Sequence, residues 1–372
     1  MTSKKRILSG IKPTGTPHIG NYAGMIKPML DLAARTDVDV NIFIADYHSL
    51  NDANARKNLG QASIEMAATL LALGFDANKV VFYRQSDVPE TFELTSFLSN
   101  FTPKGLLNRA HANKAAIDAE AMRLLNEEYR GDDGNLLPGK GSSLTIDESA
   151  QLLAAKERAA RDRAEDKVNM GLFLYPLLMS ADILLFDADQ VPVGRDQRQH
   201  IEIARDIAAS VNAIYGKDTL KLPEGLISAD TMEIPGLDGR KMSKSYGNVL
   251  PVFAPAAEVE KICKKITTDS KLPAEPKDPE NLLVKFHLAM STPEQHKDFL
   301  ARFLPGGMGY GDAKKEVAAL HEAKFGKARD EYDRLMKDAG YVNKVLLEGA
   351  AKARAIAGPV MHRVRKAAGF YV

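Results

Sequence analysis

The sequence predicts an α/β protein in which a parallel sheet is covered by helices and is followed by an all-helical C-terminal part. In the first half, strand-like runs alternate with helical patterns; the strand-like runs are "RILSG" (6–10), "VDVNIFIAD" (38–46) and "KVVFYRQSD" (79–87). Such alternation is typical of parallel strands joined by right-handed helical crossovers. After about residue 255 only helical patterns remain, which predicts a domain boundary near 250–260.

The remaining elements of the predicted α/β domain follow in order. The segment "RKNLGQASIEMAATLLALGF" (56–75) has apolar residues at helical spacing and a glycine near its end, Gly74, that suits a helix C-cap. The segment 191–211 is typical of a strand, a tight loop and an amphipathic helix. The glycine-rich and basic segment "GLDGRKMSKSYGN" (236–248) predicts an exposed loop.

Residues 118–168 differ in amino-acid composition from the segments on either side. Two charged, alanine-rich segments flank a centre of Gly, Asp, Pro and Ser, and Thr145 with Glu148 is typical of a capping box. We predict a helical insertion with a loop at its tip, and we favour a solvated helical hairpin without chemistry of its own.

The composition of the 372 residues is that of a globular protein, with 45% hydrophobic and 27% charged residues. The single cysteine, Cys263, excludes an internal disulfide and a cysteine-based zinc site. No stretch is apolar enough for a membrane span, and the N-terminus lacks the apolar core of a secretory signal. These features predict the cytoplasm, and the net charge of +1 indicates no global attraction to nucleic acid.

Three polar loops are expected to follow strands, at 12–21, 194–197 and 239–247. Ligands of open parallel sheets bind beyond the carboxyl ends of the strands, so the three loops are candidates for one site. In the first loop a helix begins near Gly20, and its free N–H groups suit a phosphate. His18 and Asn21 add polar side chains on the same turn, although a plain turn with a solvated histidine is an equal alternative.

The other two loops have complementary chemistry. Asp196 and Gln197 begin a helix and suit ribose hydroxyls, with Gly194 leaving room for a nucleoside; a simple N-cap is the structural alternative for the aspartate. Lys241 and Lys244 of "KMSKS" (241–245) suit phosphate oxygens, and a mobile cationic loop can close as charge develops. An ordinary basic surface loop is the alternative.

Together the loops predict a nucleoside triphosphate site that is neither a P-loop nor a dinucleotide fold, because both glycine fingerprints are absent. The strings "PHIGN" (17–21), "GRDQ" (194–197) and "KMSKS" resemble the signatures of class I aminoacyl-tRNA synthetases of the tyrosyl/tryptophanyl subgroup. "LYPLLMSADILLF" (174–186) and "GRKMSKSYGN" (239–248) are similar to the bacterial tryptophanyl members. The likeness runs from about residue 7 to the C-terminus, with the insertion as an exception and Lys12 standing where several members carry Gln.

The resemblance implies a Rossmann-like catalytic domain over 1–255 that forms tryptophanyl-adenylate from ATP and tryptophan and passes the tryptophanyl group to tRNA. It implies catalytic roles for His18, Asn21, Lys241 and Lys244. Mg²⁺ is expected on the phosphates, with no dedicated metal site on the protein. The residues expected to bind ATP are Lys12, Pro13, Thr14, Gly20, Asn21, Gly194, Arg195, Asp196, Gln197, Lys241, Met242, Ser243, Lys244 and Ser245.

The resemblance also implies an indole pocket. Indole has one N–H donor and no acceptor, so its pocket needs one acceptor among apolar walls. Asp182 is expected to accept the N–H, although a helix cap or a satisfied core acid is the structural alternative. The residues expected to bind tryptophan are Asp182, Met179, Tyr175, His48 and Leu8. A structural hydrogen bond is an equal alternative for His48.

The C-terminal helices, 256–372, are expected to bind the tRNA anticodon region. Between 341 and 372 there are six basic residues (Lys344, Lys352, Arg354, Arg363, Arg365, Lys366) against one acid, Glu348. Such an excess suits an RNA backbone, although a solvated charged face is the commoner alternative and the RNA role is inferred only together with the three loops. The resemblance implies a homodimer. Three alternatives are a tyrosyl enzyme, a small nucleotidylyltransferase and a tRNA-binding paralogue without aminoacylation activity.

Overall fold

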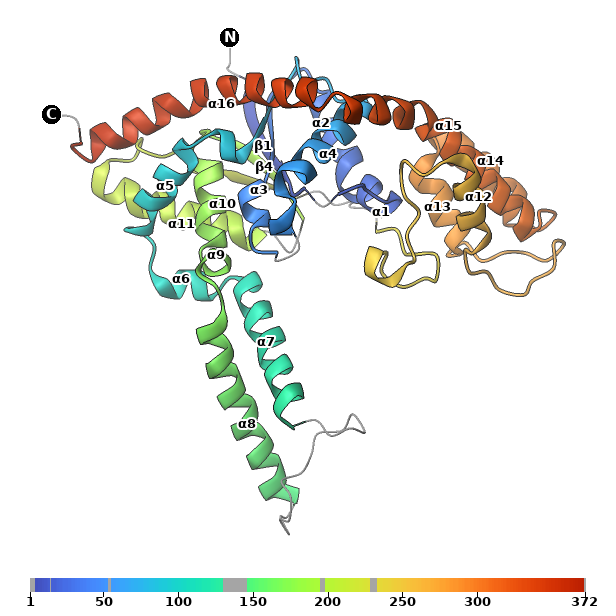
Figure 1. Ribbon diagram of the computed structural model, residues 1–372, viewed down its shortest axis with the longest axis horizontal. Coiled ribbons are helices and arrows are strands. Elements are labelled where there is room, and N and C mark those ends of the chain that lie inside the picture. Colours follow the sequence, from blue (N-terminus) through green and yellow to red (C-terminus); the bar gives the residue numbers. More distant parts are fainter. Residues whose placement is uncertain are drawn as a thin grey trace. The chain divides into compact units, whose positions relative to one another are not determined.

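The chain forms two compact units in a computed structural model that describes residues 4–13, 15–52, 55–129, 146–194, 198–227 and 233–370 (Figure 1). The first unit contains Met1–Pro89, Ala188–Arg195 and Glu224–Pro359. The second contains Glu90–Asp187, Asp196–Pro223 and Val360–Val372. Among the described residues, none of the helices combines the length and the apolar character that a membrane crossing requires.

The first unit contains a parallel sheet in the order β3-β2-β1-β4-β5, which confirms the predicted α/β class. Its strands are β1 (Lys5–Ile11), β2 (Val38–Ile44), β3 (Val81–Arg84), β4 (Gln190–Val193) and β5 (Glu224–Ile227). Strand β5 was not expected. It is a four-residue edge strand whose Leu226 is exposed, so it lacks the apolar pattern that marks a buried strand.

Helices cover this sheet and continue into the C-terminal half of the unit. They are α1 (Ile19–Asn21), the π-helical turn η1 (Tyr22–Ile26), α2 (Lys27–Ala33), α3 (Asp46–Ser49), α4 (Leu59–Ala72), α12 (Ala256–Lys264), α13 (Leu282–Met290), α14 (Pro293–Phe303), α15 (Tyr310–Lys337) and α16 (Ala339–Ala367), with short 3-10 turns η2 (Ala55–Lys57), η3 (Gln85–Asp87) and η5 (Lys244–Tyr246).

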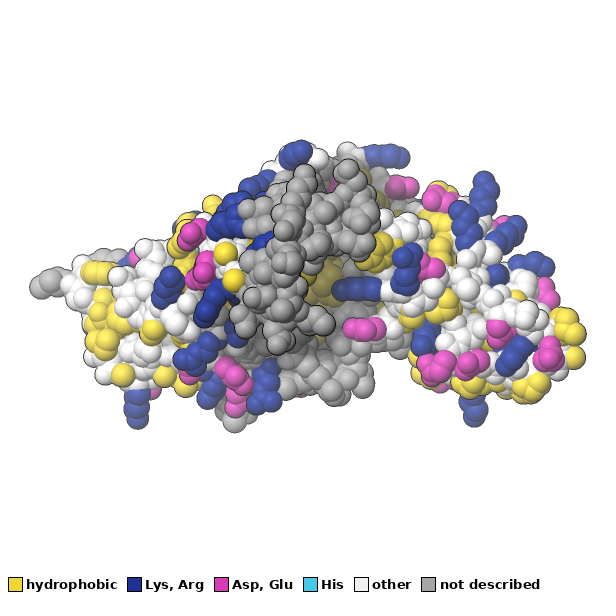
Figure 2. Space-filling view, turned by 90° about the horizontal axis from the view of Figure 1, so that it is seen from below, with side chains coloured by type: hydrophobic (Ala, Val, Ile, Leu, Met, Phe, Trp, Pro, Cys, Tyr) yellow, Lys and Arg dark blue, Asp and Glu magenta, His cyan; other side chains and the backbone are white. Residues whose placement is uncertain are grey.

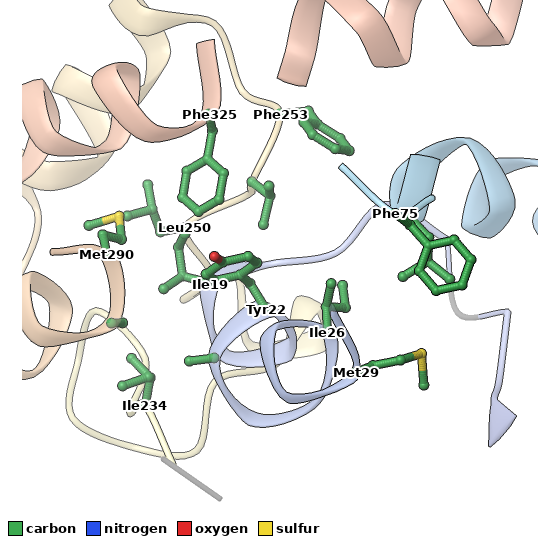
Figure 3. Packing of buried hydrophobic residues seen from close by; sticks show 14 of the residues in the cluster. Ile19, Tyr22, Ile26, Met29, Phe75, Ile234, Leu250, Phe253, Met290 and Phe325 are labelled. Atoms are coloured by element: carbon green, nitrogen blue, oxygen red, sulfur yellow. The ribbon is translucent and has the colours of Figure 1, made fainter. Parts of the chain in front are cut away.

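One hydrophobic cluster joins the sheet to the C-terminal helices. It includes residues of β1 and β2 together with residues of α12 to α15. Figure 3 shows Ile19 and Tyr22 beside Leu250 and Phe325, and the rings of Tyr22 and Phe325 meet edge to face with centroids 4.9 Å apart. The compact unit therefore runs across the expected boundary near 255, and a functional division at that point stays a prediction.

The second unit is helical. Its elements are α5 (Glu90–Ser99), α6 (Lys104–Asn108), α7 (His111–Tyr129), α8 (Ile146–Lys167), α9 (Met170–Phe173), α10 (Tyr175–Leu184) and α11 (Arg198–Tyr215), with the end of α16. Helix α10 packs against α5 and α11.

Helices α7 and α8 lie side by side and form the helical hairpin expected for the insertion (Figure 1). They bury a small cluster of their own that includes Leu124 and Ala160. The hairpin begins at His111, earlier than the expected residue 118, because α7 continues without a break from that point. The expected tip and Thr145 lie outside the described residues.

Helix α16 lies directly on the backbone of β3. A Cβ atom placed on Gly349 would stand 1.6 Å from the carbonyl oxygen of Phe82 and 2.5 Å from its carbonyl carbon. Two heavy atoms cannot approach so closely, so only glycine allows the helix to lie at this distance from the edge strand. Gly60, in helix α4, has no atom within 4 Å of its equivalent Cβ position apart from its chain neighbours and its own helix backbone.

We expect Gly349→Ala to lower the thermal unfolding midpoint, because α16 must shift away from β3 at an overpacking cost of about 1–3 kcal/mol or more. Gly60→Ala is the matched control. It should leave the midpoint unchanged or raise it, because alanine favours a helix over glycine by about 1 kcal/mol. Differential scanning calorimetry of both variants checks this, and equal midpoints would contradict the packing argument.

Candidate active site

The first candidate loop connects the carboxyl end of β1 to a helical segment that begins at Ile19. His18 and Asn21 cap this helix reciprocally. The backbone N–H of Asn21 donates to Nδ1 of His18 at 3.2 Å, and the backbone N–H of His18 donates to Oδ1 of Asn21 at 3.2 Å. Both side chains therefore satisfy groups at a helix start that would otherwise lack partners.

This cap determines which atoms of the two side chains face a ligand as donors. Because Nδ1 of His18 accepts a hydrogen bond, the neutral ring carries its proton on Nε2. Burial and then the nearby Lys244 lower the pKa of His18 to about 4, so the ring is neutral at pH 7. His18 thus offers Nε2–H, and Asn21 offers its Nδ2 amide, as donors at the helix N-terminus.

We call the loop 239–247, which carries Lys241 and Lys244, the lysine loop. The segment that follows it is hydrogen-bonded to the first loop, 12–21. The N–H of Ile19 donates to the carbonyl of Leu250 at 2.9 Å, and the N–H of Val252 donates to the carbonyl of Pro17 at 3.0 Å. His18 and Pro251 consequently form an antiparallel bridge. These bonds join two segments separated by more than two hundred residues in the chain.

The lysine loop itself lies against the first loop through Met242 and Lys244. A Cβ on Gly20 would be 3.4 Å from Sδ of Met242, and a Cβ on Gly15 would be 3.5 Å from Nζ of Lys244. Gly15 has a φ of 74°, a conformation that favours glycine. The structure therefore brings Lys244 beside the loop that carries His18, as expected for the first and third loops.

The carboxylate of Glu65 in α4 lies near Lys244. Burial lowers the pKa of Lys244, and the attraction of Glu65 opposes this shift. Glu65 was not singled out in the sequence, because it occupies an ordinary position on an amphipathic helix. Lys241 and Ser245 are exposed, and Ser243 and Ser245 join their hydroxyls at 2.8 Å.

Several other expected residues lie at the carboxyl edge of the sheet. Lys12 and the buried Pro13 follow β1, His48 is buried in α3 after β2, and Gly194 follows β4. Burial lowers the pKa of Lys12, against the attraction of Asp52. Leu8 is buried in β1 itself, short of this edge. The expected residues Thr14, Arg195, Asp196 and Gln197 lie outside the described residues.

Asp46 is a buried carboxylate that sequence reasoning did not single out. Its Oδ1 accepts the backbone N–H of Tyr47 at 3.0 Å and that of Ser86 at 3.1 Å, so it ties the end of β2 to the end of β3. Burial raises its pKa. Its position directly after a strand was the signal that could have identified it.

The expected indole-binding residues of the second unit share helix α10. Asp182 is buried, while Tyr175 and Met179 are half-buried. The spacing of four and three residues places the three on one side of the helix. Tyr175 meets the ring of the buried His200 edge to face at 5.6 Å.

The basic residues near the C-terminus are partly used within the chain. Arg363 forms a two-pronged ion pair with Asp187 and donates to the carbonyl of Thr219, and Arg365 pairs with Glu93. On the face drawn in Figure 2, Lys and Arg side chains are interspersed with Asp and Glu. Arg363 and Arg365 are therefore engaged in ion pairs within the chain.

We expect Lys244→Ala to raise the pKa of His18 above about 4, towards the ordinary value of 6.5 without reaching it, because burial remains the larger cause. Lys241→Ala is the control and should leave this pKa unchanged. Histidine ring NMR titration, with His18→Asn for assignment, measures both.

The same titration has a consequence for stability. The folded state keeps His18 neutral down to about pH 4, whereas the unfolded chain protonates it near 6.5. Its contribution to folding is therefore fully present above pH 6.5 and is lost as the pH falls to 4. An unperturbed His18 pKa would contradict the described burial.

Comparison with known proteins agrees with this arrangement. The family model described as "tRNA synthetases class I (W and Y)" matches residues 1–126 and 142–326, and the break between them falls inside the helical insertion. The chain is 43% identical over 369 residues to "Tryptophan--tRNA ligase" of Bordetella pertussis, covering 99% of this chain and 73% of that protein. The corresponding ligase of Pseudomonas putida is 43% identical over 367 residues, covering 98% of this chain and 73% of that protein.

Among solved structures, the tryptophanyl-tRNA synthetase of Campylobacter jejuni, complexed with ADP and tryptophan, aligns with a TM-score of 0.76 at 37% identity and covers 98% of this chain and 99% of that one. A tyrosyl-tRNA synthetase of Archaeoglobus fulgidus aligns with a TM-score of 0.58 at 19% identity, covering 89% and 91%, which shows a shared fold alone. The chain belongs to the class I tRNA synthetases of the tryptophan and tyrosine group, and within that group to the tryptophan--tRNA ligases.

Proposed function

We propose that this ligase joins the carboxylate of L-tryptophan to the α-phosphate of ATP and then transfers the tryptophanyl group to the 3′-terminal ribose of tRNA(Trp). In the first step a carboxylate oxygen attacks the α-phosphorus and the bond to the bridging oxygen of pyrophosphate breaks. In the second step a ribose hydroxyl attacks the carbonyl carbon and AMP leaves. The protein contributes positioning and charge stabilisation in both steps.

The observation that supports this most is a contact at the carboxyl edge of the sheet. The loop 12–21, which carries His18 and is called the histidine loop below, lies against the lysine loop. A helix N-terminus with neutral His18 and Asn21 donors lies beside the Lys244 ammonium. Negative charge develops on the leaving pyrophosphate, and such preorganised donors and cations stabilise it. We assign this role to His18, Asn21, Lys241 and Lys244, with Mg²⁺ carried by the phosphates of ATP.

The remaining ATP contacts are proposed from position in the sequence. Gly194 follows β4 at the same edge of the sheet, and the residues after it, Arg195 to Gln197, are proposed to hold the adenosine. Lys12 and Pro13, directly after β1, are proposed to border the phosphates, as are Met242, Ser243 and Ser245 of the lysine loop.

Tryptophan is proposed to be recognised through its one polar group. Asp182, on α10, accepts the indole N–H, and Met179 and Tyr175 of the same helix contribute apolar surface. Leu8 and His48 are the further proposed contacts. A site that reads a donor discriminates against ligands that lack it, because its acceptor would be left unpaired.

The helices from 256 to 372 are proposed to contact the anticodon region of tRNA, within a homodimer in the cytoplasm, where tRNA is charged. Lys344, Lys352 and Lys366 are exposed and are available for this role. Tyrosine as the substrate is not favoured, because the relatives at 43% identity are named as tryptophan ligases. A tRNA-binding paralogue without aminoacylation activity is not favoured for the same reason.

Lys244→Ala should slow adenylate formation by about 10²–10³-fold, with a much smaller loss of ATP affinity, because its contact strengthens as charge develops on pyrophosphate. Lys261→Ala, an exposed lysine of α12, is the control and should retain the full rate. Single-turnover kinetics separate the rate from ATP affinity. A variant with the wild-type rate and weakened ATP binding would refute the assigned role.

Tryptophan binding should be visible in the ligand's own fluorescence, because the chain contains no tryptophan. Entry of indole into an apolar pocket should shift or quench its emission, and Asp182→Ala should weaken binding by about 1.5–3 kcal/mol, the value of a hydrogen bond to a charged group. Asp206→Ala, an exposed acid on α11, is the control. Strong displacement by tyrosine, or no retained tryptophan in equilibrium dialysis, would overturn the substrate assignment.

A further inference from the structure

Asn248 closes the lysine loop from its far end. Its side chain is buried, with 4% of its surface exposed, and makes three hydrogen bonds. Oδ1 accepts the backbone N–H of Ser243 at 2.9 Å, and Nδ2 donates to Oδ1 of Asp238 at 2.8 Å and to the carbonyl of Lys241 at 3.1 Å. One amide thus contacts the backbone on both sides of Met242.

The backbone around Asn248 reinforces this closure. Its carbonyl accepts the N–H of Leu237 at 2.9 Å, so the two ends of the loop are joined. A Cβ placed on Gly236 would lie 2.1 Å from Nδ2 of Asn248, which leaves the amide no room to move on that side. Gly247, directly before it, has a φ of 64° and ends the turn that begins at Lys244.

Asp238 completes the arrangement on the exposed side. Its carboxylate also accepts from the backbone N–H of Arg240 at 3.1 Å and from Nε of the same residue at 2.8 Å. The hydrogen bond from Asn248, followed by that from Arg240, lowers the pKa of Asp238 to about 2. The carboxylate therefore remains an acceptor at every pH at which the enzyme would be assayed.

We propose that Asn248 is a positioning residue for adenylate formation, which holds the backbone at Lys241 and Ser243 so that Lys244 lies beside the histidine loop. The inference rests on the proposed function of Lys244. Asn248 acts on the leaving pyrophosphate only through the loop, since the three side-chain bonds described above are all made to loop residues. Its loss should therefore matter only while Lys241 and Lys244 are present to be positioned.

The amide is required because it both donates and accepts. Asn248→Asp keeps the acceptor for Ser243 but places a carboxylate oxygen where Nδ2 meets Asp238 and the carbonyl of Lys241, so two attractions become repulsions. Asn212 provides a matched control. Its amide joins a loop of the second unit in the same way, by accepting the N–H of Leu220 at 2.8 Å and donating to its carbonyl at 2.8 Å.

The experiment measures single-turnover adenylate formation in the full-length enzyme for Asn248→Ala, Asn248→Asp and Asn212→Ala. Both Asn248 variants should slow the step by about tenfold or more with an ATP affinity within about threefold of wild type, because the loss falls on the transition state. Asn212→Ala should keep the wild-type rate. Asn248→Ala added to the variant that lacks both lysines, Lys241→Ala with Lys244→Ala, should slow that variant no further, because interacting residues are not additive.

Limited trypsin digestion gives a second readout that does not depend on activity. Cleavage after Arg240, Lys241 and Lys244, mapped by mass spectrometry, should accelerate in both Asn248 variants and stay unchanged in Asn212→Ala. If Asn248→Ala lowers the overall unfolding midpoint, Asp238→Ala serves instead. It removes one partner of Asn248 together with the two bonds to Arg240, so its readout is cleavage after Lys244, which should still accelerate.

Wild-type rates in both Asn248 variants would overturn the inference, as would a further loss when Asn248→Ala is added to the variant that lacks both lysines. A wild-type enzyme that shows no tryptophan-dependent exchange of pyrophosphate into ATP would refute the proposed function itself. If Lys244→Ala slows adenylate formation while both Asn248 variants keep the wild-type rate, only the role of Asn248 would be refuted.

Discussion

Two backbone hydrogen bonds, from Ile19 to Leu250 and from Val252 to Pro17, hold the candidate active site together. They join the loop after the first strand to the segment after the lysine loop. Because backbone groups form them, side-chain substitutions at these positions do not remove them directly. Everything else at the site depends on this junction, including the position of Lys244 beside Gly15 and that of Met242 beside Gly20.

The junction is in turn supported by helix α15. His321 shares a hydrogen bond with the carbonyl of Pro251 at 2.9 Å, and Arg329 donates to the carbonyl of Ala254 at 3.1 Å. Tyr332 stacks on Phe253 with ring centroids 4.6 Å apart. Helix α15 thus supports the segment 251–254 beside the candidate site, so a truncation near residue 255 would remove this support as well as proposed tRNA contacts.

Electrostatics and capping cooperate at the histidine loop. A protonated His18 would lose its role as the acceptor for the Asn21 N–H and would face the Lys244 ammonium. Burial and that cation both oppose protonation, so the neutral ring, the helix cap and the nearby lysine are mutually consistent. The same neutral ring leaves Nε2–H as a donor. The structural role of His18 and its proposed catalytic role therefore fall to different atoms of one side chain.

Local patterns in the sequence determined the parallel α/β class, strands β1 to β4, the helical hairpin and the chemistry of the histidine and lysine loops, because apolar periodicity and turn residues act over short distances. Only the tertiary structure decided which loops meet, since that depends on contacts between segments such as 17–19 and 250–252. It also decided that α12 to α15 share the core of the sheet, that Gly349 lies on β3, and that Arg363 and Arg365 are paired within the chain. Glu65 carried no local signal, and Asn248, although it ends the string "GRKMSKSYGN", had no role that the string could assign. A helix-surface acid and a loop amide acquire their roles only from neighbours that folding brings to them.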